Sequence, residues 1–275
     1  MSDELLEKVE DGVLTITFNR PDKLNAFTYP MMGKLVALLE NAAYEPSIKV
    51  VVLAGAGRGF CSGADIRSYA VLDEADEVAV RWHKDPVWLT AEMRIAQVTR
   101  YTRASLLLHT MPKPTIAAMR GPVAGMGLCL AAACDLRIAS ETAVLTTVFS
   151  SVARSGDYGG SYLLTHIVGP AKARELYLLS DKIKADEAYR IGLVTKVVPD
   201  ADLEKETAAL TSKLAKGPPL AYRYIKKNLA AAETMTFEQV IEIEANNMMR
   251  CSQSEDVREH FRASRDKREP QYKGM

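Results

Sequence analysis

The sequence predicts an α/β fold, because segments with the two-residue period of strands alternate with segments that have the helical period. Residues 12–18 alternate apolar and polar side chains as a half-buried strand does, and residues 50–53 form a continuous apolar run typical of a strand covered on both faces. Between them, residues 31–43 place their apolar side chains on one helical stripe. A strand, a helix and a strand in this order predict a parallel pair joined by a crossover.

The same alternation continues in the middle of the chain. Residues 115–118 and 135–139 are short apolar segments expected to form strands, and residues 128–133 between them are apolar and small, as in a buried helix. Residues 71–110 differ, because an acidic and aromatic stretch leads into a long helical pattern that ends near residue 109. We interpret this stretch as a segment that covers the substrate.

Only helical patterns follow residue 200. They cover residues 203–215, 220–232 and 237–250, and a charged tail comes after them. We therefore divide the chain into a core of residues 1–200 and a helical region of residues 201–275. Because the helical region has no strands and carries many apolar side chains, we expect it to pack on the core or on another subunit.

Length and composition fit one large core, or one core with a helical appendage, because 48% of the 275 residues are hydrophobic and 25% are charged. Thirty-five basic residues balance thirty-five acidic ones, so no overall field attracts nucleic acid. No apolar run is long enough to cross a bilayer, and we expect a cytoplasmic protein without a membrane partner. The cysteines at 61, 129, 134 and 251 lack the spacing of a metal site or a disulfide framework, and we expect free thiols.

Two glycine-rich segments follow predicted strands. Residues 55–67 carry four glycines in their first nine positions but match neither a phosphate loop nor a dinucleotide fingerprint. Residues 121–127 open the apolar helix, whose first backbone N–H groups have no partner within the helix. If these N–H groups meet those around Ala64, two donors converge on one carbonyl oxygen and stabilise an oxyanion by several kcal/mol, roughly. The alternative is that both segments are only tight turns.

Several stretches together resemble the crotonase superfamily, the enoyl-CoA hydratases and isomerases, along almost the whole chain. The matching stretches are residues 19–26, 59–66, 113–118, Gly121 with 125–127, 134–139 and 191–194. The resemblance implies a core that is a spiral of repeated ββα units, followed by a C-terminal helical oligomerisation region. It further implies a homotrimer or a dimer of trimers.

The resemblance also implies where an acyl-CoA thioester would bind. The backbone N–H groups of Ala64 and Met126 correspond to the donors that hold the thioester oxygen. Met126 stands where the family commonly has glycine, which is compatible with a main-chain donor. Further positions that the resemblance associates with the substrate or CoA are Lys23, Ala26, Asp65, Ile66, Arg67, Gly125, Cys129, Phe149 and Lys267.

One departure from the family pattern concerns the two glutamates that flank the substrate in typical hydratases, which fall here on Cys129 and Phe149. Neither side chain can do the work of a carboxylate, and hydration is helped by two proton-handling groups. Asp157 instead resembles the aspartate of the isomerase branch, which includes the ring-epoxide phenylacetyl-CoA isomerase. It also resembles the attacking aspartate of the 4-chlorobenzoyl-CoA dehalogenase branch.

Asp157 has two interpretations. Flanked by Tyr158 and near Phe149, it would be partly desolvated, which raises its pKa and suits it to exchange a proton near neutral pH. Alternatively, it caps the N-terminus of the apolar helix that follows.

We favour isomerisation of an enoyl-CoA, with the thioester oxygen on the N–H groups of Ala64 and Met126 and with Asp157 as the acid and base. This chemistry needs no metal and no redox cofactor, since coenzyme A is part of the substrate. The alternatives are an enoyl-CoA hydratase, an acyl-CoA hydrolase or dehalogenase, and a non-catalytic acyl-CoA-binding protein.

Overall fold

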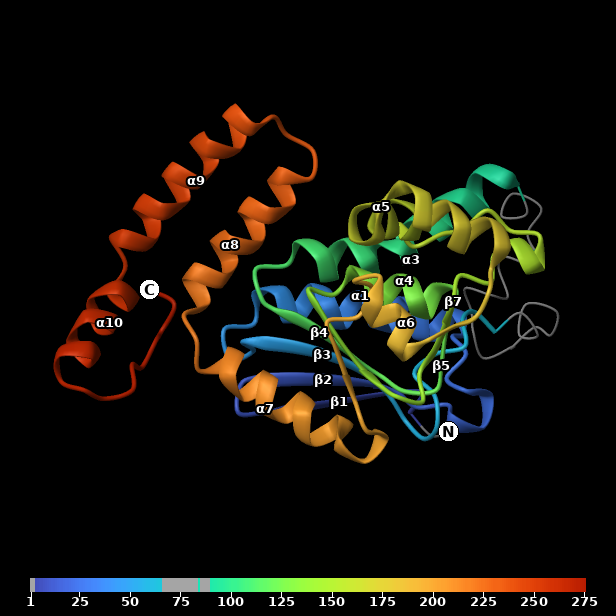
Figure 1. The fold of residues 1–275 in the computed structure, drawn as a ribbon, viewed down its shortest axis with the longest axis horizontal. Coiled ribbons are helices and arrows are strands. Elements are labelled where there is room, and N and C mark those ends of the chain that lie inside the picture. Colours follow the sequence, from blue (N-terminus) through green and yellow to red (C-terminus); the bar gives the residue numbers. More distant parts are fainter. Residues whose placement is uncertain (1–2, 66–83, 85–89) are drawn as a thin grey trace.

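The computed structural model describes residues 3–65, 84 and 90–275, and its central feature is a six-stranded sheet (Figure 1). Across the sheet the strands are β1 (Leu5–Glu10), β2 (Val13–Phe18), β3 (Val50–Gly55), β4 (Thr115–Met119), β6 (Leu136–Ser140) and β9 (Lys196–Val198). The first pair is antiparallel and the later pairs are parallel. The helix α1 (Tyr29–Tyr44) connects the parallel strands β2 and β3, which confirms the predicted crossover.

A second, smaller sheet lies beside the first. It contains β5 (Pro122–Ala124), β7 (Val144–Thr146) and β8 (Ile183–Lys184). Because β5 begins shortly after β4 ends, the chain turns directly from one sheet into the other. Cys61 forms an isolated parallel bridge with Val123 of β5, so the loop after β3 runs along this second sheet.

Helices cover both faces of the main sheet and form the C-terminal region. Besides α1, they are α3 (Ala91–Thr110), α4 (Met126–Ala133), α5 (Gly160–Leu179), α6 (Ala185–Arg190), α7 (Leu203–Ala215), α8 (Pro219–Ala232), α9 (Phe237–Ser252) and α10 (Glu255–Arg265). Short 3₁₀ turns are η1 (Pro21–Lys23), η2 (Ser150–Val152) and η3 (Asp200–Asp202). None of the helices among the described residues has the length and apolar character needed to cross a membrane.

The continuous apolar run of β3 is explained by burial on both faces. Val51 and Leu53 enter the larger hydrophobic cluster, which α1 and α4 share. Val50 and Val52 point the other way and enter a second cluster with Leu203 of α7. Successive side chains of a strand point to opposite faces, so both faces of β3 must be apolar. In Figure 1, α7 lies on one side of the sheet and α1, α3 and α4 lie on the other.

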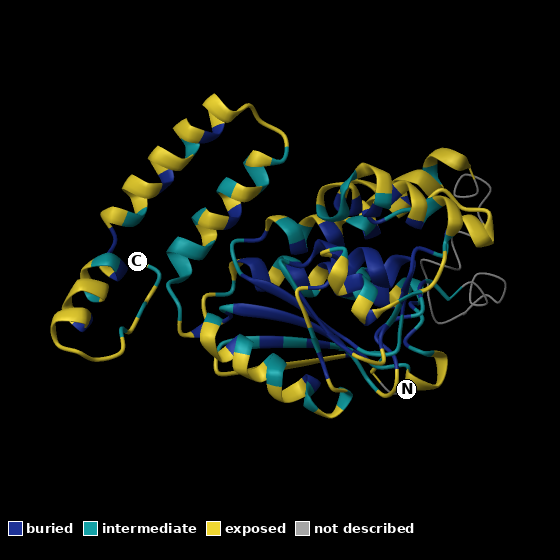
Figure 2. Cartoon of the chain, in the orientation of Figure 1, coloured by how far each residue is buried: buried dark blue, intermediate teal, exposed yellow. Residues whose placement is uncertain are grey.

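The last three helices leave the core as an arm, which we define as residues 219–275 (Figure 1). α8 and α9 lie side by side, and α10 follows at the far end. Much of the arm surface is exposed (Figure 2). Lys226 of α8 is 9% exposed and attaches the arm to the core, because its Nζ lies 2.7 Å from Asp135 Oδ2.

Two terminal elements differ from what the sequence patterns predicted. The expected charged tail is in part a helix, α10, in which Ser254 caps the first turn by accepting a hydrogen bond from Val257 N at 3.2 Å. Ion pairs one turn apart, such as Arg258 with Glu255, also stabilise this polar helix. At the other end, β1 is a strand that the patterns did not predict. The sequence patterns therefore missed both α10 and β1.

Candidate active site

The loop after β3 aims the backbone N–H of Ala64 away from its neighbours. Ala64 forms a parallel bridge with Phe27, in which Phe27 N donates to Gly63 O at 2.9 Å and Asp65 N donates to Phe27 O at 2.8 Å. In such a bridge, the bonds to Phe27 come from the residues on either side of Ala64, so the N–H of Ala64 points to the opposite side. This N–H therefore stays available for a ligand.

Met126 is the first residue of α4, and its N–H lies at the start of the helix. It follows Gly125, whose φ of 52° and ψ of −121° suit only glycine. A helix cannot pair its first amides internally, so these donors face outward. At Gly127, an added Cβ would lie 2.6 Å from Cys61 Cβ, so glycine lets α4 pack directly against the loop that carries Ala64.

Phe149 links the start of α4 with residues 156–160, the segment that carries Asp157. A Cβ at Gly125 would lie 3.9 Å from Phe149 Cε1, and a Cβ at Gly156 would lie 3.6 Å from Phe149 Cδ2. The Phe149 ring also stacks on Tyr177, with centroids 5.7 Å apart and planes 12° apart. Phe149 thus forms an apolar wall between the first turn of α4 and the segment of Asp157.

The Asp157 carboxyl is partly removed from water. Its Oδ1 atom is buried and has no hydrogen-bond partner among the described residues. Burial raises the pKa of this carboxyl, and the opposing charge of Arg154 lowers it. The net direction is upward, which brings the carboxyl toward the pH range in which it can both take and return a proton.

The alternative role of Asp157 as a helix cap is wrong. α5 begins at Gly160, and its N-cap is Gly159, which has a φ of 70° and makes no capping hydrogen bond with a side chain. Asp157 lies two residues before the cap, and its carbonyl, not its carboxyl, accepts a hydrogen bond from Gly160 N at 3.1 Å. The helix therefore starts later than a cap at Asp157 would require.

Cys129 and Tyr177 complete the polar surroundings of Asp157. Burial, followed by the charge of Asp157, raises the pKa of the Cys129 thiol, so Cys129 stays protonated. At Gly160, an added Cβ would lie 2.3 Å from Cys129 Sγ and 2.4 Å from the Tyr177 hydroxyl oxygen. Only glycine therefore lets α5 start against these two side chains.

Sequence reasoning missed Tyr177. It lies 17 residues after Gly160, which is about 25 Å along a straight helix. α5 is not straight, because Gly169 has a non-helical φ of 79° and ψ of 160° and Pro170 follows it. The second half of α5 therefore returns to the segment of Asp157, and the Gly-Pro pair was the signal in the sequence for this reversal.

Of the other predicted site residues, Asp65 and Ala26 support the loop that carries Ala64, and Lys23 lies on the surface. Asp65 is held by an ion pair with Arg20 at 2.9 Å, and Arg20 also donates to Ala26 O at 2.5 Å, so these positions brace the loop of Ala64. Lys23 is exposed at the end of η1, and its carbonyl accepts a hydrogen bond from the Ser62 hydroxyl at 3.3 Å.

Ile66 and Arg67 lie outside the described residues, as does most of the first part of the expected substrate-covering segment. Lys267 follows α10 on the arm, which extends away from the sheets (Figure 1). The fold of a single chain therefore does not bring Lys267 to Ala64 and Met126.

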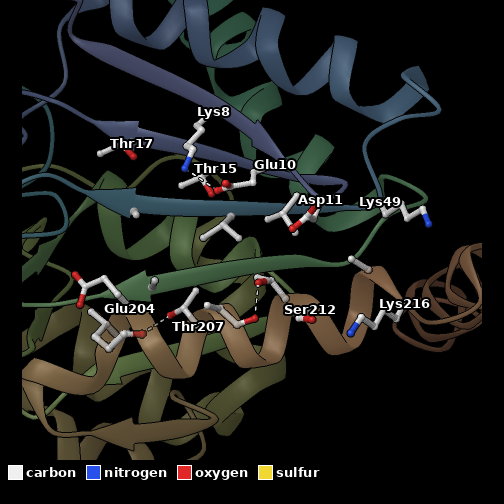
Figure 3. Close-up of a pocket in the computed structure, with 18 of the residues that line it drawn as sticks. Lys8, Glu10, Asp11, Thr15, Thr17, Lys49, Glu204, Thr207, Ser212 and Lys216 are labelled. Carbon is white, nitrogen blue, oxygen red and sulfur yellow. Dashed lines mark hydrogen bonds and ion pairs between the residues drawn. The ribbon is translucent and has the colours of Figure 1, made fainter. Parts of the chain in front are cut away.

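A groove of about 1020 Å³ lies elsewhere, between the outer face of the main sheet and α7 (Figure 3). Thr15 and Thr17 of the sheet face Thr207 and Ser212 of α7 across it. Of the predicted site residues that the structure describes, none lines this groove. Cys129, Phe149 and Tyr158 belong to the hydrophobic cluster on the opposite side of the sheet. The candidate site is therefore the junction of α4, α5 and the loop after β3.

Comparison with known proteins identifies the class to which this fold and site belong. The enoyl-CoA hydratase/isomerase family model matches residues 8–275. Among solved structures, an enoyl-CoA hydratase from Bacillus anthracis superposes with a TM-score of 0.89 at 28% identity, over 99% of this chain and 100% of that one. A putative enoyl-CoA hydratase from Streptomyces coelicolor A3(2) gives 0.88 at 32% identity, over 99% and 95%.

Curated relatives carry two kinds of name. The chain is 32% identical over 274 residues to the 1,2-epoxyphenylacetyl-CoA isomerase of Escherichia coli K12, covering 100% of both chains. It is 33% identical over 267 residues to a probable enoyl-CoA hydratase of Rhodobacter capsulatus, covering 97% of this chain and 96% of that one. The chain belongs to the enoyl-CoA hydratase/isomerase family and is an enzyme of that family, with the crotonase fold expected from its motifs.

Proposed function

We propose that this enzyme isomerises a double bond or a ring in an acyl-CoA thioester, with Asp157 as the acid and base. The observation that carries the proposal is the partly desolvated Asp157 carboxyl, which has one buried oxygen without a partner among the described residues. Cys129 and Phe149 supply no carboxylate beside it, so a reaction that needs a single proton-handling group fits the site best.

In the proposed reaction, the thioester oxygen accepts hydrogen bonds from the N–H groups of Ala64 and Met126. Asp157 removes a proton from one carbon, and the electrons of that C–H bond delocalise onto the thioester oxygen as an enolate. Asp157 then returns the proton to another carbon, so the composition of the substrate does not change. The two amides stabilise the developing charge, and such stabilisation usually lowers the barrier more than any other effect in a site of this kind. These steps use only protein groups and no metal or redox cofactor, with coenzyme A as part of the substrate.

Hydration of an enoyl-CoA is the second candidate. The name of the Rhodobacter capsulatus relative favours it. In that reaction, Asp157 and a bound water would together replace the missing pair of carboxylates. Hydrolysis or dehalogenation is a third possibility, in which Asp157 attacks the substrate and is acylated or arylated.

The assembly that we propose is a homotrimer or a dimer of trimers. The arm supports this proposal, because large apolar side chains such as Phe237, Met248 and Phe261 are each more than half exposed on it. In such an assembly, Lys267 would meet CoA bound at another subunit. Light scattering after size exclusion tests the subunit number. The cytoplasmic location stays a prediction.

Mass spectrometry of turnover tests the reaction. The enzyme is incubated with 2-enoyl-, 3-enoyl- and cyclic acyl-CoA thioesters, in H₂¹⁸O and separately in D₂O. Isomerisation predicts products of unchanged composition that gain deuterium, and loss of this exchange in Asp157→Asn. Incorporation of one ¹⁸O water into the product would support hydration instead. A covalent adduct on Asp157 would support the third possibility, and full turnover by Asp157→Asn would refute the role of Asp157.

A further inference from the structure

Three polar groups meet where α4 and the two halves of α5 converge. They are the Cys129 thiol, the Tyr177 hydroxyl and the Asp157 carboxyl. Besides burial, the charge of Asp157 raises the pKa of both Cys129 and Tyr177, and Cys129 and Tyr177 also shift the pKa of each other. The Tyr177 hydroxyl oxygen is buried and finds no nitrogen or oxygen partner among the described residues. Asp157 Oδ1 is also buried and has no hydrogen-bond partner among the described residues. Two buried oxygens that both lack a nitrogen or oxygen partner among the described residues are unusual in a folded protein.

The positions of the two neighbouring glycines locate Tyr177 beside Asp157. A Cβ at Gly156 would lie 2.8 Å from Tyr177 Cε1, and a Cβ at Gly160 would lie 2.4 Å from its hydroxyl oxygen. The hydroxyl end of the ring therefore lies between Gly156 and Gly160, which stand on either side of Asp157 in the sequence. The ring also stacks on Phe149, which fixes its plane.

We infer that Tyr177 is a positioning residue for Asp157, and that its hydroxyl donates a hydrogen bond to Asp157 Oδ1 when this carboxyl is charged. The Tyr177 hydroxyl is hydrogen-bonded to Cys129, which lies where the family has a glutamate. In the inferred arrangement, the Tyr177 proton turns from this sulfur to Asp157 when the carboxyl is charged, and the Cys129 thiol then donates to the Tyr177 oxygen. This inference rests on the proposed role of Asp157 as acid and base. It assigns the chain a relay of neutral donors in place of a second carboxylate.

The charge states of the neighbours support the relay. Burial raises the pKa of the Tyr177 hydroxyl and the pKa of the Cys129 thiol, so both keep their protons at neutral pH and serve as donors. Of the described groups that face Asp157, Arg154 is the cation, and it is exposed to solvent, which screens its charge. A hydrogen bond from Tyr177 therefore supplies the local stabilisation of the carboxylate that burial removes.

Tyr177→Phe removes the hydroxyl and keeps the ring that stacks on Phe149. A hydrogen bond to a charged group shifts its titration by about one pH unit or more. We expect the acidic limb of kcat to move up by about one pH unit, so that the rate on this limb falls about tenfold while KM stays unchanged. Tyr162→Phe is the matched control, because Tyr162 lies on the same helix and its hydroxyl donates to Glu233 at 3.0 Å.

A titration without substrate separates this inference from the proposed function. Carbon-13 NMR of protein labelled at the aspartate carboxyls gives the midpoint of Asp157, with Asp157→Asn to identify its signal. A higher midpoint in Tyr177→Phe than in the wild type and in Tyr162→Phe would support the relay, even if no thioester is isomerised. An unchanged midpoint in Tyr177→Phe would overturn it, even if Asp157 proves essential for turnover.

Discussion

Cys61 and Val123 pair as residues of two parallel segments, in which Cys61 N donates to Pro122 O at 3.0 Å and Ala124 N donates to Cys61 O at 2.8 Å. Three residues beyond each partner lie Ala64 and Met126. The pairing therefore holds the two candidate oxyanion donors at the same end of both segments. This relationship makes the backbone N–H of Met126 a target that can be tested on its own.

Replacement of Met126 by proline is expected to reduce kcat by about 10²–10³-fold, the usual effect of losing one oxyanion donor. Proline lacks an N–H, yet it is well tolerated at the first position of a helix, where Met126 lies. Met126→Val is the control, since valine has as many side-chain carbons as proline and keeps the amide. Steady-state kinetics gives kcat, and circular dichroism checks that the helices are retained. Equal turnover by the two variants would show that this amide does not hold the thioester oxygen.

Arg20 is expected to support both stability and substrate binding. Its guanidinium contacts Asp65 at 2.9 Å and Glu4 at 2.9 Å, and the Arg20 and Asp65 side chains are only 17% and 15% exposed. Arg20→Met leaves Asp65 without this partner, so we expect a loss of about 2–3 kcal/mol in the free energy of unfolding. KM should rise, because the loop that carries Ala64 loses the ion pair between Arg20 and Asp65 that holds its conformation. Urea unfolding and kinetics measure both effects, with the exposed Arg58→Met as control. Identical stability of the two variants would contradict this role.

The core was predictable where burial leaves a pattern in consecutive residues. Residues 50–53 must be apolar at every position because both faces of β3 are covered, and the sequence shows this directly. α10 was not predicted because its stability comes from a cap and from ion pairs and not from an apolar stripe. Ser254 followed by Glu255 and Asp256 was nevertheless a readable start signal.

The site was predictable only in part. The positions of Ala64, Met126 and Asp157 follow from motifs that are continuous in the sequence. Tyr177 reaches Asp157 only because α5 reverses at Gly169, and no local pattern states where the second half of a broken helix will pack. The sequence also left capping by Asp157 open as an alternative, since the apolar run does not reveal that Gly159 is the cap.

Lys226 is expected to hold the arm on the core. Its Nζ donates to Asp135 Oδ2 at 2.7 Å and to the carbonyls of Leu108 and Lys113 at 3.1 and 3.0 Å. Lys226→Met removes the cation and leaves Asp135 partly buried without it, which should lower the free energy of unfolding by about 3 kcal/mol. Urea unfolding measures the loss. Lys227→Met changes the exposed neighbour and should have almost no effect, so similar losses in both variants would contradict an anchoring role.

Asp157→Asn is expected to make the protein more stable at high pH. Burial raises the folded-state pKa of Asp157 above its unfolded value, so the folded protein loses stability as the pH rises through the folded pKa. Asparagine has the shape of the protonated acid and cannot ionise. We expect Asp157→Asn to melt about 2–4 °C higher than the wild type at pH 8, which corresponds to about 1 kcal/mol.

This difference should shrink as the pH falls and vanish below about 3.9, the pKa of an unfolded aspartate, where both states of the wild type are protonated. Thermal unfolding of both proteins across this pH range is the measurement. A gain of the same size at every pH would mean that the carboxylate charge is not its cause. A gain confined to high pH, together with lost turnover, would mean that the fold keeps a destabilising charge at this position because the reaction requires it.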